Sequence, residues 1–372
     1  MARSEGFREP GDRSRPHSWR AAVGACLSAA LLVACGGAGV TPVLTIETLA
    51  PTRQVTQAPT PAPTPTVEEL LAALRDPASA ETRARAAEAL GQVTDPAVVP
   101  ALVSALADED IDVRIAVATS LGSQGDAGAA KALAAALLSE LKADPSSAFV
   151  AAAAAALGQL SGTAGVAALI AVLATTDETN LEAARSALKE IGAPAVPALQ
   201  KALLTGAREK KIQVVNVLAS LGSAGVKPLI TALTNKDAKV RSAAANRLGY
   251  LGDRSAEKGL AAVLADPGMG LTASVALARL YRDEPSKLVH YLTATKTLHI
   301  YYGLLQIGAS ETVTALANAL RQRGDLAMAE DFLNCGEPTL EQAAHDWAYA
   351  HGYQVVTNPG QPDETWGGGL PE

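Results

Sequence analysis

Histidine and carboxylate side chains are the groups of this chain that could hold a metal ion or move a proton. The five histidines are His17, His290, His299, His345 and His351. None of them is followed by Glu, and their spacings match no standard pattern of metal ligands. A site would form only if folding gathered the last four near Asp346. We therefore expect surface or packing histidines, with no metal ion and no cofactor.

A run of acidic residues from Asp108 to Asp112 resembles the start of a calcium-binding loop. Such a loop needs glycine at its sixth place and an acid at its twelfth, where this chain has Val113 and Thr119. The run therefore predicts a turn. The chain also contains no phosphate-binding glycine-rich loop, nucleophile elbow or Cys-x-x-Cys pair, so the sequence predicts no catalytic residue.

The beginning of the chain has the pattern of an export signal. Arg13, Arg15 and Arg20 precede an uncharged, mostly apolar run over 21–34, which Cys35 follows. A run of this length is too short to cross a bilayer as a permanent helix. It is typical of a secretory signal peptide.

Residues 32–35 read Leu-Val-Ala-Cys and resemble the lipoprotein box of bacteria. The resemblance implies that the signal peptide, 1–34, is removed and that Cys35 becomes a lipidated N-terminus, which holds a protein on a membrane without spanning it. An ordinary signal peptide or a buried cysteine is the alternative. On the lipoprotein interpretation we expect an extracytoplasmic protein that is lipid-anchored to a bacterial cell membrane. Cys335 is then left without a partner for an internal disulfide.

The next segment, 35–66, has a different composition. Pro alternates with Thr and Ala in it, and no helical period appears. Proline denies the backbone its hydrogen-bond donors, so we predict a disordered, fairly extended linker after the lipidated N-terminus.

Residues 67–283 repeat one short theme. A leucine recurs in the middle of an apolar stripe, at separations of 31, 36, 30, 30 and 31 residues: Leu102, Leu133, Leu169, Leu199, Leu229 and Leu260. A fixed period of this kind marks units that bury their apolar face only by stacking on a neighbour. Each unit contains two stripes at steps of three and four residues, which predicts two helices per unit. The third unit is longer, which predicts a longer first helix or a projecting loop.

A Leu-Gly pair closes many of the second stripes, as at 90–91, 121–122, 157–158 and 248–249, with shifted equivalents at 191–192 and 221–222. Glycine ends helices because it adopts a left-handed conformation without strain, so we expect the second helices to end there. Asp95, Asp126 and Asp253 then open the next helix as caps. In two units an acid stands four residues before an arginine, at 110 and 114 and at 237 and 241, and Arg83 holds the equivalent place in the first unit.

The segments LRDPASAETRARAAEALGQVTDPAVVPAL and LTNKDAKVRSAAANRLGYLGDRSAEKGL resemble HEAT repeats of the phycobilisome-lyase-like subgroup. The resemblance implies an all-α fold, an α-solenoid of stacked antiparallel helix pairs, with the second helix of each pair on the concave side. It also implies that the Asp and Arg positions form a ladder between neighbouring units. The match is strong over 67–283 and weaker over 284–352, where we expect degenerate helical repeats and a C-terminal cap, followed by a tail at 353–372.

The C-terminal part holds nine of the 13 aromatic residues. They are Tyr281, Tyr291, Tyr301, Tyr302, Phe332, Trp347, Tyr349, Tyr353 and Trp366. A terminal repeat needs an atypical outer face because nothing stacks beyond it, so the rings are expected to seal the end of the array. A binding site is the alternative, since Tyr and Trp dominate interaction hot spots.

The formal charge of −7 gives the chain no general electrostatic reason to bind phosphate backbones. The cluster of Arg208, Lys210 and Lys211 is better interpreted as a solvated helix start than as a nucleic-acid site. We expect no nucleic-acid partner.

The function that these features favour is a non-catalytic, membrane-anchored interaction scaffold that binds a protein partner through its concave helical surface. The candidate partner-binding residues are exposed polar positions of the second helices. They are Glu81, Arg85, Glu88, Arg114, Thr119, Glu182, Arg185, Lys211, Asn216, Arg241 and Asn246.

The rival hypothesis is an enzyme or enzyme subunit related to bilin lyases or to hydroxylases built from HEAT repeats. Those hydroxylases bind iron through His-Glu pairs, which this chain lacks. Export also argues against chromophore attachment, which is normally a cytoplasmic task. A structural spacer of the cell envelope, without a stable partner, is the third hypothesis.

Overall fold

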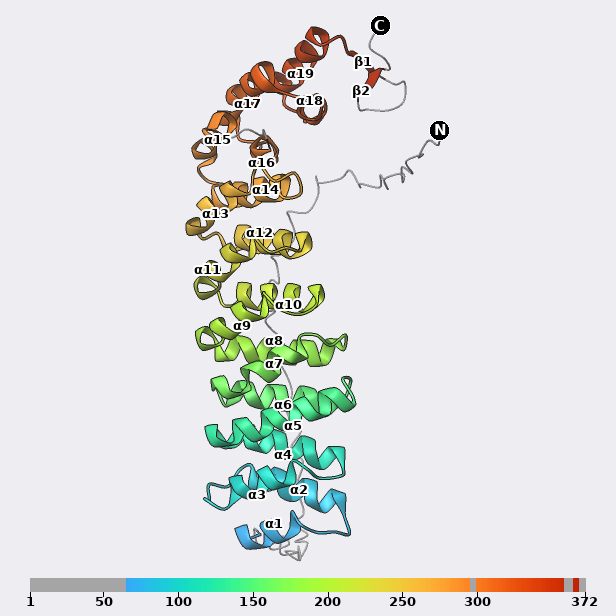
Figure 1. Cartoon of the computed structure of the whole chain (residues 1–372), viewed down its shortest axis with the longest axis vertical. Coiled ribbons are helices and arrows are strands. Elements are labelled where there is room, and N and C mark those ends of the chain that lie inside the picture. Colours follow the sequence, from blue (N-terminus) through green and yellow to red (C-terminus); the bar gives the residue numbers. More distant parts are fainter. Residues whose placement is uncertain (1–64, 295–298, 358–363, 368–372) are drawn as a thin grey trace, which may run out of the picture. The chain divides into compact units, whose positions relative to one another are not determined.

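The computed structural model describes residues 65–294, 299–357 and 364–367 (Figure 1). The signal peptide, Cys35 and the linker up to residue 64 lie outside these described residues. The predicted export signal and lipid anchor are therefore expectations from the sequence.

Within the described residues, α1 to α14 form seven antiparallel pairs, each with a first and a second helix. The first helices are α1 (Val67–Ala73), α3 (Val98–Ala105), α5 (Ala130–Ala143), α7 (Val166–Val172), α9 (Val196–Ala202), α11 (Ser223–Ala232) and α13 (Glu257–Ala262). The second helices are α2 (Ala80–Leu90), α4 (Ile111–Gln124), α6 (Ala148–Gln159), α8 (Glu178–Ile191), α10 (Arg208–Ser220), α12 (Ala238–Leu251) and α14 (Gly270–Leu280).

The helices begin at residues that satisfy their free amides. The Thr66 side chain and Glu69 form a reciprocal capping box at α1. Asp110, Asp177 and Asp237 accept backbone N–H groups at the starts of α4, α8 and α12. Such a cap is worth about 1 kcal/mol, so the turns of each unit are specified locally.

Short 3-10 turns precede several first helices. They are η1 (Ala127–Ala129), η2 (Thr163–Gly165), η3 (Ala193–Ala195) and η4 (Arg254–Ala256). The predicted caps Asp126 and Asp253 stand at the starts of η1 and η4, and Asp95 accepts the Ala97 amide just before α3. The acidic positions expected to open the next helix are thus confirmed.

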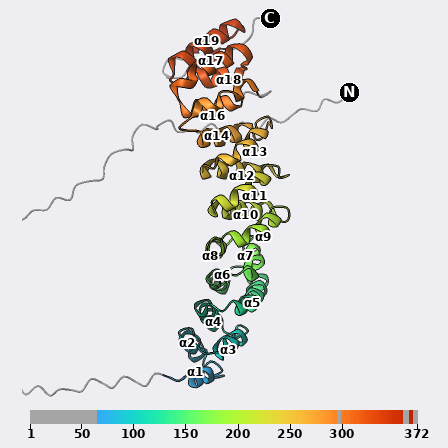
Figure 2. The same ribbon diagram turned by 90° about the vertical axis from the view of Figure 1, so that its left-hand side faces the viewer.

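Successive units stack through helices of the same kind. Each second helix packs on the next along the row from α2 to α14, and α14 packs on α16. Figure 2 shows the first helices on one side of this stack and the second helices on the other. The six repeat leucines from Leu102 to Leu260 are fully buried between the layers. Burial of one such side chain stabilises the fold by about 1.5–3 kcal/mol, and the predicted α-solenoid of stacked helix pairs is confirmed.

The expectation that the Leu-Gly pairs end the second helices is wrong at three of them. Gly122, Gly158 and Gly249 lie inside α4, α6 and α12. A Cβ at Gly158 would lie 2.8 Å from the Cα of Ala187 in α8. The glycines are required there because neighbouring second helices approach closely. At the shifted pairs the expectation holds, since Gly192 and Gly222 adopt positive φ at the ends of their units.

The third unit has the longer first helix that its sequence predicted. Helix α5 spans 14 residues, whereas α3 spans eight and α7 spans seven. Among the described residues, no helix is both long and apolar enough to cross a membrane.

After α14 the chain forms η5 (Pro285–Leu288), α15 (Tyr291–Ala294), α16 (Ile300–Ile307), α17 (Ser310–Arg323), α18 (Leu326–Leu333) and α19 (Pro338–Ala350). Helix α19 packs against both α17 and α18. The strands β1 (Gln354–Thr357) and β2 (Glu364–Gly367) pair antiparallel within the segment that was expected to be a plain tail. This sheet is not apparent from the sequence pattern.

The aromatic residues of this region divide into buried and exposed ones. Tyr301, Phe332 and Trp347 are buried, and the Tyr301 and Phe332 rings meet edge to face with centroids 5.9 Å apart. Tyr349, in contrast, is 90% exposed. Some rings therefore fill the core between α16, α18 and α19, while Tyr349 is open to a partner.

Candidate functional site

All of the predicted partner-binding residues lie on second helices. The structure places Glu81, Arg85 and Glu88 on α2, Arg114 and Thr119 on α4, Glu182 and Arg185 on α8, Lys211 and Asn216 on α10, and Arg241 and Asn246 on α12. Exposed among them are Glu81, Arg85, Glu88, Thr119, Glu182 and Asn246, and the remaining five are half-buried. We call the solvent-facing side of α2, α4, α6, α8, α10, α12 and α14 the second-helix face.

Arg114 and Arg241 are engaged inside the stack. Arg114 donates to the carbonyl oxygens of Asp108 and Glu109 in its own turn, and to Glu140 of the next unit at 3.2 Å. Arg241 contacts the turn before its helix in the same way, and its Nη2 lies 3.7 Å from Asp266 of the next unit. Both side chains therefore tie a turn to the neighbouring unit.

Arg83 occupies the same position in the first unit and makes the tightest of these contacts. Its Nε and Nη2 donate to the two carboxylate oxygens of Asp108, each at 2.8 Å, and its Nη1 donates to the carbonyl of Asp76. The hydrogen bonds from Arg83 hold the pKa of Asp108 below its usual range.

The ladder between units that the resemblance implied is therefore present, with different acids from those noted in the sequence. Asp110 caps α4, whereas Asp108 and Glu140 receive the arginines. Asp237 does join units, because Arg208 donates to it at 2.6 Å, but Arg241 is not its partner. The open pocket of about 510 Å³ beside Arg83 and Asp108 lies along this edge of the stack.

A polar network runs across α8 and α10 on the second-helix face. Arg185 donates to Glu178 and Glu182 of its own helix and, through Nη2, to Gln213 Oε1 on α10 at 2.8 Å. The Asn216 amide donates to the same Gln213 oxygen at 3.3 Å. The predicted residues Glu182, Arg185 and Asn216 are thus brought together, whereas Glu81 and Arg85 pair with each other on α2.

Sequence reasoning missed the continuation of this network on α12 and α14. Arg247 donates from Nε to Asn216 Oδ1 at 3.0 Å. The Arg279 guanidinium of α14 lies over the Tyr250 ring, 4.1 Å from its centroid. Tyr250 is 69% exposed, so an aromatic ring and two arginines share one open surface. The signal in the sequence is that 238–251 and 270–280 together contain four basic residues and no acid.

The C-terminal units hold a second polar cluster, around Glu257. Tyr281 donates to Glu257 Oε2 at 2.5 Å and Tyr291 donates to Oε1 at 2.8 Å. The hydrogen bond from Tyr281, and to a lesser extent that from Tyr291, lowers the pKa of Glu257. Burial raises the pKa of Tyr291 to about 12. The two phenols join α13 to the residues after α14, so the cluster is an inter-unit contact like the arginine ladder.

Three of the histidines contact the backbone of the array. The Nδ1 atoms of His290, His299 and His351 each lie within hydrogen-bond distance of a backbone carbonyl, and His351 stacks on Trp347. In the described part of the chain no three His, Cys, Asp or Glu side chains are arranged to hold a metal ion. Cys335 is half-buried, and burial raises the pKa of its thiol.

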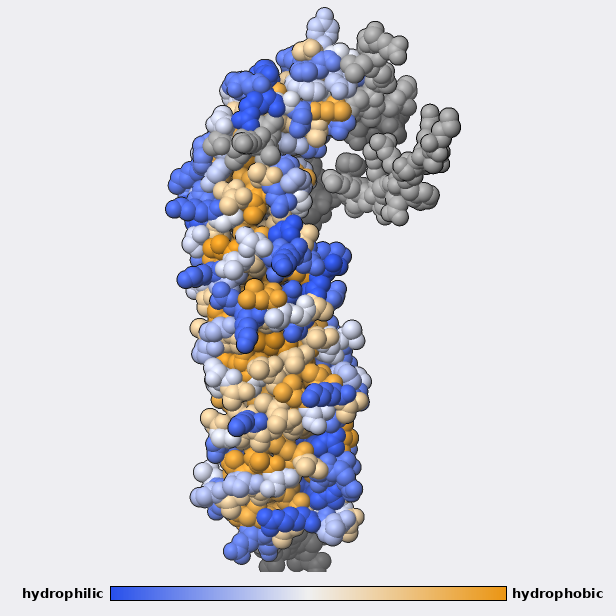
Figure 3. All heavy atoms as spheres, in the orientation of Figure 1, coloured by the Kyte–Doolittle hydropathy of each residue, from blue (hydrophilic) through white to orange (hydrophobic). Residues whose placement is uncertain are grey.

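The opposite side of the stack has a different character. Figure 3 shows hydrophobic residues gathered over the first helices α3 to α9. Partly buried members of this surface include Val99, Val103, Ala132 and Ala136. The polar networks described above lie on the second helices, so the two sides of the stack differ in chemistry.

The comparison with known protein families agrees with the architecture over part of the chain. Residues 67–141 match the family model described as HEAT repeats. No curated protein sequence matches the chain.

Three solved structures match the chain at low identity and with low TM-scores. The complex of CpcE and CpcF of phycocyanin lyase from Nostoc sp. PCC7120 is 23% identical over 67% of this chain and 96% of that one, with a TM-score of 0.34. Human deoxyhypusine hydroxylase is 18% identical over 77% and 96%, with a TM-score of 0.28. Importin beta is 14% identical over 76% of this chain and 46% of that one, with a TM-score of 0.40.

The matched repeats at 67–141 and the helix pairs that continue their stack lead to one assignment. Residues 67–141 match HEAT repeats, and the helix pairs of the described residues form an α-solenoid.

Proposed function

We propose that this protein is a membrane-anchored, extracytoplasmic lipoprotein that acts as a non-catalytic scaffold and holds a protein partner on its second-helix face. The observation that carries the proposal is the unbroken row of second helices from α2 to α14, each packed on the next. A partner lying along that row would meet exposed polar side chains of several units at once. Affinity then comes from the sum of many contacts, as in other stacked-repeat proteins.

The fixed geometry of this face supports the proposal. Arg185, Gln213, Asn216 and Arg247 are joined by hydrogen bonds across three helices. Side chains that are already held in place lose less conformational entropy when a partner binds, so a partner gains affinity from this arrangement.

The scaffold role is tested by charge changes on the two sides of the stack. Glu88→Arg combined with Asn246→Glu alters two exposed positions of the second-helix face, on α2 and α12. Lys131→Glu combined with Lys227→Glu reverses the charge at two exposed positions of the first helices α5 and α11. We expect the first pair to lose the partner captured from membrane extracts and the second pair to retain it. Equal capture of the partner by the two double variants would show that the partner does not bind the second-helix face.

The anchor is tested separately. Cys35→Ser removes the thiol that would carry the lipid, so the variant should leave the membrane fraction while its folded repeats stay intact. Cys335→Ser is the matched control and should stay with the membrane. Equal partition of the Cys35→Ser variant and the unchanged protein into the membrane fraction would refute the anchor.

A further inference from the structure

The basic residues of this acidic protein are concentrated in one stretch. Residues 205–282 contain 12 of the 31 basic and five of the 38 acidic residues, a net charge of +7, which leaves −14 for the rest of the chain. The segments on either side, 67–204 and 283–372, each carry −8. The net charge of the whole chain therefore conceals a local reversal of sign.

The second helices of this stretch carry much of the excess. Together α10, α12 and α14 hold seven basic residues and a single acid, Glu209. Arg208 is paired with Asp237, and Arg241 is held by its turn and by Asp266. Arg247 and Arg279 have no carboxylate within ion-pair distance among the described residues. Their positive charge is left for a ligand from outside the chain.

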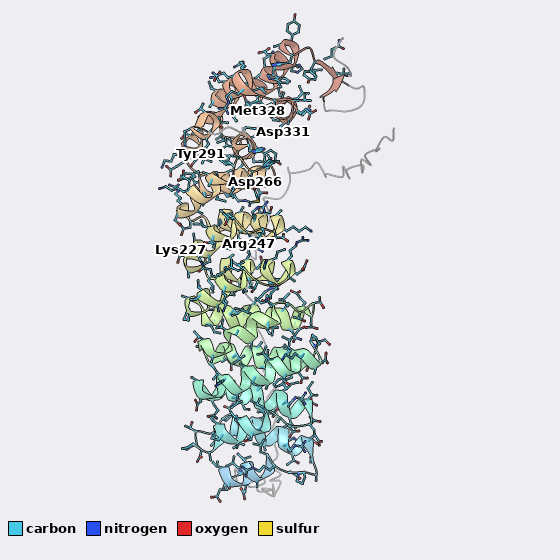
Figure 4. The ribbon with its side chains drawn as sticks, in the orientation of Figure 1. Lys227, Arg247, Asp266, Tyr291, Met328 and Asp331 are labelled. Atoms are coloured by element: carbon cyan, nitrogen blue, oxygen red, sulfur yellow. The ribbon has the colours of Figure 1, made fainter. Side chains whose placement is uncertain are left out.

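Both guanidinium groups are nevertheless oriented. Arg247, labelled on α12 in Figure 4, donates from Nε to Asn216 Oδ1 of α10 at 3.0 Å. The Arg279 guanidinium of α14 lies over the ring of Tyr250, which follows Arg247 by about one helical turn. We call Asn216, Arg247, Tyr250 and Arg279 the arginine-tyrosine patch. It crosses three consecutive second helices.

This arrangement suits carboxylates. A guanidinium that is fixed through its Nε or its flat face keeps its two Nη groups for a bidentate bond to a carboxylate. An exposed tyrosine between two arginines adds apolar contact area at low entropic cost, and Tyr and Arg are the residue types enriched at interaction hot spots. The patch combines both features in one place.

We propose that the arginine-tyrosine patch binds an acidic segment of a partner protein, with Arg247 and Arg279 each receiving one carboxylate and Tyr250 packing between them. This inference rests on the scaffold function proposed above and names the chemistry of the partner.

The flanking charges favour a short acidic segment over a long polyanion. A nucleic acid or an anionic membrane surface extends beyond three units and would meet the two segments that carry −8 each, where like charges repel. A short run of Glu and Asp is confined to the basic stretch. The same argument predicts that binding weakens as salt is added, because exposed charges are screened.

The test uses the full chain and a labelled short peptide of alternating Glu and Gly, with a Lys-Gly peptide as the probe of opposite charge. Fluorescence anisotropy should show binding of the acidic peptide and none of the basic one. Arg247→Ala combined with Arg279→Ala should lower the affinity for the acidic peptide at least about tenfold, which corresponds to about 1.4 kcal/mol of binding free energy. Arg247→Lys combined with Arg279→Lys should lower this affinity less, because lysine keeps the positive charge but cannot form the bidentate bond.

Lys227→Ala is the control, since this exposed cation belongs to the same basic stretch but lies on the first helix α11. It should leave the affinity unchanged, and circular dichroism should show all variants folded. Equal binding of the two peptides, or equal affinity of the double alanine variant and the unchanged protein, would overturn the inference. Stronger binding of vesicles containing phosphatidylglycerol, or of single-stranded DNA, that is lost in the same variant would also overturn it.

Capture experiments separate this inference from the scaffold proposal. A partner that is captured by the unchanged protein and equally by the double alanine variant leaves the scaffold proposal standing and contradicts the patch. No stable partner for the unchanged protein contradicts the scaffold proposal, whatever the peptide experiment shows. A partner that is captured by the unchanged protein and lost in the double alanine variant supports both the scaffold proposal and the patch.

Discussion

Glycine and arginine have two recurring roles in this array, and both concern the contact between neighbouring units. Gly122, Gly158 and Gly249 allow one second helix to lie against the next. Arg83 and Arg114 bind the turn of their own unit and an acid of the following one. The repeat units contain few aromatic side chains. Neighbouring units are joined by buried leucines, by close approach of their backbones and by hydrogen bonds between charged groups.

The glycine contact predicts a position-specific loss of stability. In Gly158→Val the new Cβ would lie 2.8 Å from the Ala187 Cα and 3.0 Å from its Cβ, so α6 and α8 must separate. We expect a cost of about 1–3 kcal/mol in the free energy of unfolding, measured by urea denaturation. Ala155→Val places the same side chain on the exposed side of α6 and should change little. Equal losses in the two variants would refute the close-approach account.

The Arg83–Asp108 pair predicts a pH dependence. Because the pKa of Asp108 is lowered in the folded state, the pair stabilises the fold above the ordinary carboxyl pKa near 3.8 and is lost as pH falls through the lower folded value. Asp108→Asn should therefore lower the melting temperature at pH 7, and its difference from the unchanged protein should shrink towards pH 3. Glu109→Gln, at a carboxylate that is 91% exposed, is the control. A difference that stays constant with pH would contradict the ionic origin of the effect.

At the scale of helices, the array separates into repeats that copy one pattern and a C-terminal group that departs from it. Phe332 of α18 is fully buried and meets Tyr301 of α16, whose hydroxyl also donates to Asp331 at 2.8 Å. Figure 4 labels Met328 and Asp331 on α18. Burial raises the pKa of Tyr301, so this phenol stays protonated as a donor.

These contacts predict a local effect of a core mutation. Phe332→Ala removes a large buried ring and should cost about 3–5 kcal/mol. In a stacked array each unit contacts only its neighbours, so hydrogen exchange should accelerate in α16 to α19 and remain slow in α4 to α8. Tyr349→Ala removes a side chain from the same group that is 90% exposed and should leave the exchange pattern unchanged. Uniform acceleration along the chain after Phe332→Ala would contradict this independence of the units.

The helix pairs could be predicted from the leucine period because burial of a repeated apolar stripe is a local property of the sequence. The role of Gly158 could not be predicted, since a glycine after an apolar stripe suits both a helix end and a close helix contact, and only the register with Ala187 decides. The acids that receive Arg83 and Arg114 stand 25 and 26 residues ahead of them, beyond the reach of helical spacing. The contact between Tyr250 and Arg279 spans 29 residues and is also beyond that reach, whereas the excess of basic residues on α12 and α14 could be read from the sequence.

At the scale of the whole molecule, the stack has two chemically different sides and a reversal of charge along its length. The first helices α3 to α9 present an apolar surface, whereas the second helices carry the hydrogen-bonded networks. The basic stretch at 205–282 lies between two acidic segments. A scaffold built in this way would bind partners through one side and distinguish them by charge.

The central claim is that partners bind on the second-helix face, and photo-crosslinking in living cells tests it most directly. A crosslinking amino acid is placed either at Asn246 on α12 or at Lys227 on α11, both exposed. We predict a discrete crosslinked product of larger mass from Asn246 and none from Lys227. The same product from both positions, a product from Lys227 alone, or none from either would contradict the claim.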